Sequence, residues 1–84
     1  MYSLFFKNPS KKFLKKLNKK DLKRVLDKLE QLKKNAKLGF PLVGSFTGLR
    51  KLRIGGCRVI YKVINDELVI VIIDISHRKN IYKK

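Results

Sequence analysis

Residues 49–61 read LRKLRIGGCRVIY, and this stretch decides the fold. Two β-rich runs flank a pair of glycines, which is a strong signal for a hairpin with a two-residue turn. If the glycines are the central turn residues, Ile54 faces Cys57 and the pairing continues outward until Arg50 faces Tyr61. The sequence therefore predicts both a hairpin and its register.

Side chains alternate between the two faces of such a hairpin. The apolar set is expected to form the core face: Leu52, Ile54, Cys57, Val59 and Tyr61. The other face carries Lys51, Arg53 and Arg58. Arg53 lies directly opposite Arg58 in this register, and like charges in that position destabilise a sheet. Two interpretations of this face stay open: a solvated outer surface, or an anion site in which guanidinium groups bind phosphate.

The rest of the chain completes an α+β pattern. Residues 2–6 are a short aromatic-rich strand candidate, and the apolar spacing between residues 9 and 36 predicts two basic helices in a hairpin. After a loop that runs to about residue 47, a three-stranded antiparallel meander is expected at residues 49–54, 57–64 and 68–75. The predicted order is β-α-α-β-β-β, with the helices packed on one face of a single antiparallel sheet.

Length and composition restrict the kinds of domain and binding site that the chain can form. The chain has 84 residues, 44% of them hydrophobic, which fits one domain over residues 1–84 and argues against disorder. One cysteine excludes an intramolecular disulfide, and one histidine excludes a zinc cluster of cysteines and histidines. The acidic residues are too dispersed for a metal cluster, so we expect no metal and no cofactor. No apolar run approaches the ~20 residues of a spanning helix, and a cytoplasmic protein is expected.

Net charge is the most unusual property of the sequence. The chain has 22 Lys and Arg against 6 Asp and Glu, a net charge of +16. Self-repulsion at this density destabilises a compact monomer, so we expect a polyanionic or acidic partner to offset it. Nucleic acid, an acidic protein and an anionic membrane all qualify by charge. The apolar stripe of the helices is needed for the core, which argues against a membrane.

The end of the chain adds candidates to the cationic face. Residues 76–82 follow the last predicted strand, where a sheet gives way to a loop, and Arg78 and Tyr82 could reach the same face from there. A phosphate site beside an aromatic side chain suits RNA, because an unpaired base can stack on tyrosine.

Taken in order, these segments resemble the RelE/ParE superfamily of toxin–antitoxin toxins, and specifically the RelE-like mRNA interferases. The resemblance rests on residues 48–61, on the apolar strand after them and on the segment HRKNIY at residues 77–82. It covers nearly the whole chain. It implies a metal-independent endoribonuclease that cleaves mRNA in the ribosomal A site and inhibits translation, with the ribosome and mRNA as partners.

The resemblance also implies roles for single residues. The positions that match the catalytic pattern of the family are Lys51, Arg53, Arg58, Arg78 and Tyr82. In the implied mechanism the ribose 2′-hydroxyl attacks the adjacent phosphate, and fixed cations stabilise the transition state. Lys51 is the candidate general base because, unlike arginine, it can titrate. Arg50, His77 and Lys79 are further candidates for RNA binding, although Arg50 should point to the core face.

Two positions depart from the pattern of the family. Leu49 stands where several relatives have lysine or glutamate, and Cys57 stands where an aromatic residue is common. Cys57 fits a small buried hydrophobe, and His77 fits either a general acid or base, a backbone cap or a phosphate contact.

Resemblance and charge together imply an acidic, amphipathic RelB-like antitoxin that folds on binding. Apolar loop residues that exceed the needs of a minimal core are its candidate docking anchors: Leu38, Phe40, Leu42, Val43 and Phe46. Two other functions stay open. A ParE-like toxin on the same fold would inhibit DNA gyrase without catalytic cations, and a basic module would bind RNA without cleaving it.

Overall fold

The Gly-Gly hairpin forms in the register that the sequence predicts. β3 (Arg50–Ile54) and β4 (Cys57–Ile64) pair antiparallel, with Arg50 opposite Tyr61 and every pair between there and the turn as expected. Gly55 has a φ of 59°, a left-handed conformation that glycine adopts without steric cost. Glycine at this first central position suits the turns that match the twist of a hairpin.

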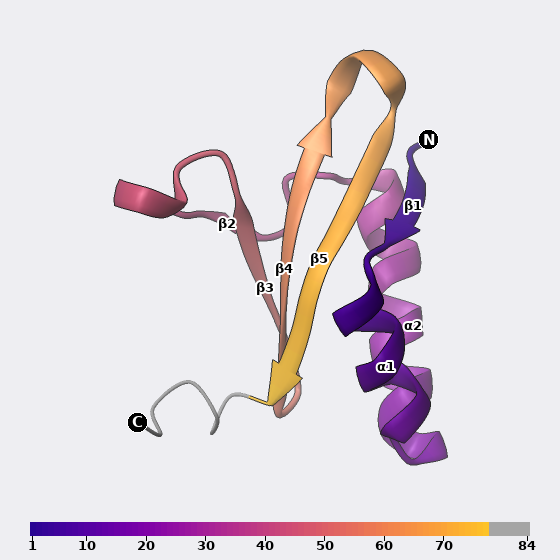
Figure 1. Cartoon of the computed structure of the whole chain (residues 1–84). Coiled ribbons are helices and arrows are strands. Elements are labelled where there is room, and N and C mark those ends of the chain that lie inside the picture. Colours follow the sequence, from indigo (N-terminus) through magenta and orange to yellow (C-terminus); the bar gives the residue numbers. More distant parts are fainter. Residues whose placement is uncertain (78–84) are drawn as a thin grey trace.

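The computed structural model describes residues 1–77 and shows a five-stranded sheet in the order β1-β5-β4-β3-β2 (Figure 1). β5 (Val69–His77) runs antiparallel to β4, and β2 (Phe40–Pro41) runs antiparallel to β3. β1 (Ser3–Phe6) pairs with β5 in parallel, so the expected single antiparallel sheet is corrected to a mixed one. Two helices rather than a tight turn follow β1, and such a long connection leaves the strand free to run parallel.

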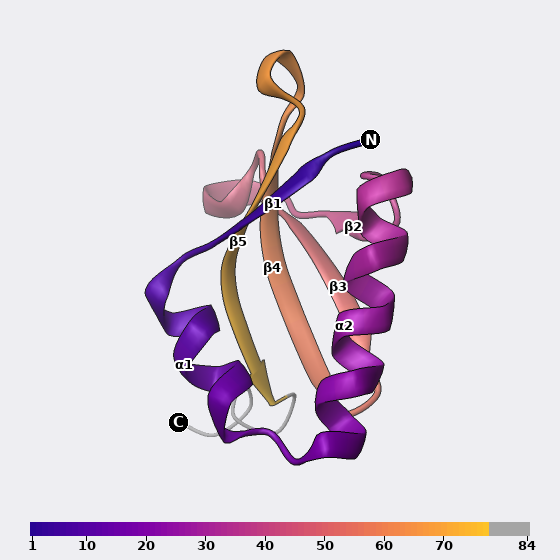
Figure 2. The same ribbon diagram turned by 90° about the vertical axis from the view of Figure 1, so that its right-hand side faces the viewer.

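The helices cover one face of the sheet, as predicted (Figure 1). α1 (Asn8–Lys16) lies beside β5 and α2 (Lys19–Lys34) lies beside β3, and the two diverge from the short connection between them (Figure 2). Asn18 in this connection caps α2, because its side-chain oxygen accepts the backbone N–H of Asp21 at 2.8 Å.

Two 3-10 turns complete the described chain. η1 (Gly44–Phe46) lies in the loop between β2 and β3, and η2 (Asn65–Glu67) joins β4 to β5. The loop with η1 projects from the sheet on the side away from the helices (Figure 1).

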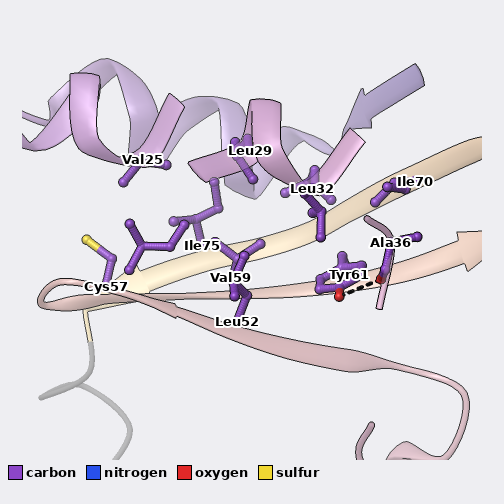
Figure 3. Close-up of a cluster of buried hydrophobic side chains, with 12 residues drawn as sticks. Val25, Leu29, Leu32, Ala36, Leu52, Cys57, Val59, Tyr61, Ile70 and Ile75 are labelled. Carbon is purple, nitrogen blue, oxygen red and sulfur yellow. Dashed lines mark hydrogen bonds between the residues drawn. The ribbon is translucent and has the colours of Figure 1, made fainter. Parts of the chain in front are cut away.

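The core lies between the helices and the sheet (Figure 3). All apolar residues that the hairpin register assigned to the core face are buried. They pack against the apolar stripe of α2 and the inward side chains of β5: Val25, Leu29, Leu32, Ile70, Ile72 and Ile75. Burial of this apolar surface is the main stabilising contribution to the fold.

A bulge interrupts β5. Ile60 pairs with Asp74 and the next residue of β4 pairs with Ile72, so Ile73 has no partner in the ladder. An extra residue shifts the alternation of a strand by one position. Ile72 is therefore buried before the bulge and Ile75 after it, whereas Asp74 turns away from the core.

A hydrogen-bonded tyrosine fixes the chain after α2. The Tyr61 side chain is fully buried, donates its hydroxyl to the carbonyl of Ala36 at 2.8 Å and accepts the N–H of Gly39 at 2.9 Å. Burial raises the pKa of Tyr61, so the hydroxyl keeps the proton that it donates. A Cβ on Gly39 would lie 2.7 Å from the carbonyl oxygen of Lys51, so only glycine lets the loop come this close.

Tyr61→Phe should lower the free energy of unfolding by about 1–3 kcal/mol, because it leaves a buried N–H and a buried carbonyl without partners. Urea denaturation measures this loss. The matched control is Tyr2→Phe, which removes an exposed bond to Asn65 and should cost about 0.5 kcal/mol or less. Equal losses in the two variants would contradict an anchoring role for Tyr61.

Candidate functional site

The sheet face away from the helices is the candidate site, and we call it the open face. No α-helix of residues 1–77 covers it (Figure 1). Strand alternation places Lys51 and Arg53 of β3 and Arg58 and Lys62 of β4 on this face. A concentration of cations on a rigid surface suits binding of a polyanion.

Three of these residues form a cluster. Arg53 lies directly opposite Arg58, and Lys51 is two residues along the same strand. Facing side chains of antiparallel strands have Cβ atoms about 4.5–5.5 Å apart. Arg53 is exposed, and Lys51 and Arg58 are half-buried. We call Lys51, Arg53 and Arg58 the cation cluster.

The cation cluster lowers the stability of the fold. Within residues 1–77, Nε of Arg58 is shielded from solvent and has no hydrogen-bond acceptor. A buried donor without a partner costs about 1–3 kcal/mol, and more when it is charged. The two ion pairs of the described chain lie within α2, so neither neutralises the cluster. An anion that accepts hydrogen bonds from the guanidinium groups would give Nε of Arg58 a partner and would reduce the repulsion between Arg53 and Arg58.

A groove of about 280 Å³ opens beside Arg58. Its walls are apolar side chains from the loop around η1 and from strands β4 and β5: Leu42, Phe46, Leu49, Ile60 and Ile73. Arg58 and Asp74 are its charged members. Apolar walls with a few convergent polar groups are typical of ligand sites.

Comparison with known proteins assigns the chain to a family. The model of the family described as ParE toxin of type II toxin–antitoxin system, parDE, matches residues 4–82. The chain belongs to this toxin family. The similarity to the RelE/ParE superfamily expected from the sequence is thereby confirmed. A search of curated protein sequences finds no match.

Solved structures of RelE toxins have the same fold as this toxin. The RelBE2 toxin–antitoxin complex of Mycobacterium tuberculosis matches with 25% identity and a TM-score of 0.84 over 92% of this chain and 98% of that one. The archaeal RelE–RelB complex of Pyrococcus horikoshii matches with 28% identity and a TM-score of 0.77 over 92% and 94%. The E. coli RelBE complex, at 20% identity and a TM-score of 0.80 over 92% and 96%, supports the fold. The predicted α+β class is confirmed.

Two further predicted residues of the toxin lie away from the open face. Arg50 pairs with Tyr61 and donates to the carbonyl of Gly39 at 2.6 Å, so it points to the core face as expected. The ring of His77 meets Phe13 of α1 edge-on, with centroids 4.9 Å apart, and lies on the helix side. The geometry therefore separates both candidates for RNA binding from the cation cluster.

The other predicted site residues of the toxin, Arg78, Lys79 and Tyr82, lie outside residues 1–77, and their roles stay predictions. Within the described range, no group of three or more His, Cys, Asp or Glu could hold a metal ion.

None of the helices in that range has the length and apolar character needed to cross a membrane. Cys57 is buried, and burial raises the pKa of its thiol, which fits a small core residue.

Sequence reasoning missed the groove and Asp74. The groove needs the loop around η1 to lie beside β4 and β5, and no local pattern predicts that placement. The signal for Asp74 was a single carboxylate within an otherwise apolar stretch of β5. A carboxylate is rarely buried in a core without a partner, so its presence there indicated a change of face.

Arg53→Thr should raise the free energy of unfolding by about 0.2–1 kcal/mol, because it removes the cation opposite Arg58. The gain should be larger at low ionic strength, where repulsion is less screened. Urea denaturation at two salt concentrations measures both effects. Lys62→Thr is the matched control, since Lys62 faces Val71 and has no cation across the strand. Equal gains in both variants would assign the effect to net charge and not to the opposed pair.

Proposed function

We propose that this toxin is a metal-independent endoribonuclease that cleaves mRNA in the ribosomal A site and so inhibits translation. The observation that carries the proposal is the cation cluster on the open face, at the positions where the resemblance to RelE-like interferases implies catalytic residues. The family assignment and the similarity to solved RelE toxins support it. The toxin would then act in the cytoplasm, where ribosomes translate.

The proposed chemistry is an internal displacement at phosphorus. The ribose 2′-hydroxyl loses its proton, its oxygen attacks the adjacent phosphorus, and the bond to the 5′-oxygen of the next nucleotide breaks. The products are a 2′,3′-cyclic phosphate and a free 5′-hydroxyl. Arginine stays protonated, so Arg58 suits stabilisation of the charge that develops on the phosphate oxygens.

The remaining roles follow from the resemblance. Lys51 would take the proton of the 2′-hydroxyl, because an amine can act as a general base where a guanidinium group cannot. Arg78 would assist the leaving 5′-oxygen, and Tyr82 would stack a base or orient the hydroxyl.

We also propose a RelB-like antitoxin as the partner of this toxin. The solved structures similar to it include RelE toxins in complex with RelB antitoxins. A net charge of +16 favours an acidic segment, and three predicted docking anchors are exposed: Phe40 at 76%, Val43 at 82% and Phe46 at 60%. Leu38 instead packs against the core, so it is not surplus as the sequence suggested.

Inhibition of DNA gyrase is the second candidate function. The matching family model describes parDE toxins, and this observation favours it. A toxin that acts by binding a protein would not need the cation cluster for catalysis. Substitutions in the cluster therefore separate the two candidates.

The decisive experiment is primer extension on an mRNA in a purified translation system with the toxin added. We expect cuts at A-site codons that require ribosomes. Arg58→Ala should slow cleavage by roughly 10²–10³-fold, the usual effect of removing one preorganised charge donor. Lys62→Ala removes the same charge from the same face but outside the cluster, and should keep activity within about threefold.

Absence of cuts with folded, antitoxin-free toxin would contradict the nuclease proposal. Equal activity of the Arg58→Ala and Lys62→Ala variants would contradict a catalytic role for the cluster. A supercoiling assay with gyrase runs in parallel, and equal inhibition by the wild-type and Arg58→Ala toxins would favour the ParE-like function.

A further inference from the structure

Asp74 is an acidic residue in an unusual place. The other acidic residues of the chain lie on α2 or in η2, whereas Asp74 lies in β5. The bulge at Ile73 turns its side chain onto the open face, opposite Ile60 and diagonal to Arg58. Diagonal neighbours are within reach of long side chains. Even so, neither ion pair of residues 1–77 involves Asp74.

The groove beside Asp74 has the size and walls for one flat ring system. Its volume of about 280 Å³ falls just below the ~300–1,000 Å³ of sites for drug-sized ligands. Phe46 contributes an aromatic ring, is 60% exposed and is therefore available for stacking. Arg58 belongs both to this groove and to the cation cluster. A nucleotide whose phosphate binds the cluster can thus place its base in the groove.

The carboxylate of Asp74 selects among the four bases. An ionised carboxylate only accepts hydrogen bonds, and it has two oxygens. Guanine presents two adjacent donors, N1–H and the N2 amino group. Adenine and cytosine place a ring-nitrogen acceptor next to their single amino group, and uracil flanks its one N–H with two carbonyl oxygens. Only guanine can therefore donate to both carboxylate oxygens without an opposing acceptor.

We propose that Asp74 and the apolar groove form a guanine-recognition subsite beside the cation cluster. This subsite rests on the proposed function insofar as RNA is the ligand, but it does not depend on cleavage. Phe46 stacks on the base, Asp74 accepts from its Watson–Crick edge, and Arg58 links base recognition to phosphate binding.

The test measures binding of fluorescein-labelled pentaribonucleotides by fluorescence anisotropy. The probes are UUGUU, UUAUU, UUCUU and UUUUU, with 2′-O-methyl groups throughout so that no 2′-hydroxyl can attack. Wild-type toxin should bind UUGUU about tenfold more tightly than UUUUU, within the range for a bidentate contact to one base. Asp74→Asn should reduce this ratio to about twofold or less, because the amide presents a donor to the donors of guanine.

Two further variants separate recognition from other effects. Glu67→Gln removes an acidic charge in η2, away from the groove, and should keep the preference for guanine. Phe46→Ala should weaken binding of all four probes, since stacking on an aromatic ring tolerates any base. Asp74 is half-buried and asparagine has nearly the same shape, so the Asp74→Asn variant should fold. Circular dichroism checks that it does.

Each result bears on a different part of the proposal. Measurable and equal binding of all four probes by the wild-type toxin would overturn the subsite and leave the RNA-binding function standing. A guanine preference that survives Asp74→Asn would overturn the role of Asp74, and a preference for another base would overturn the guanine assignment. Failure to bind any probe would overturn the subsite, whereas the ribosome-dependent nuclease would still be judged by primer extension alone. Guanine preference without cleavage of mRNA would support the subsite and remove only the nuclease.

Discussion

The buried hydroxyl of Tyr61 is the contact on which the site depends. It joins the middle of the sheet to the backbone that leaves α2, through Ala36 (Figure 3) and through Gly39. From Gly39 the chain runs directly into β2 and the loop around η1, which supplies one wall of the groove. The neighbours of Tyr61 in β4 point to the open face. One hydrogen-bonded ring in the core thus positions both walls of the groove.

The hairpin could be predicted in detail because its signals are local and agree with one another. Two glycines set the turn, strict alternation sets the faces, and a slip of one residue would bury arginine. The direction of β1 had no local signal, because residues far along the chain in β5 decide it. The apolar run of β5 carries no clear alternation, so its bulge was not predicted, and the lone carboxylate of Asp74 was the one signal of a change of face there.

The candidate site also has a part that the sequence predicts and a part that it does not. Lys51, Arg53 and Arg58 lie within the hairpin, so their common face followed from its register. The groove depends on the packing of a loop against two strands, which is a tertiary property. His77 shows the limit of the sequence most clearly. Its position at the end of a strand left several roles open, and only the shifted alternation after the bulge places its ring against Phe13.

The short strand β2 limits how copies of this toxin can associate. Exposed strand edges offer free backbone groups and invite other chains to extend the sheet. β2 has two residues, and one of them is Pro41, which has no N–H to donate. This edge therefore resists cross-β association even though Phe40 is exposed there. At this side of the sheet, copies of the toxin can meet through side chains but not by adding strands.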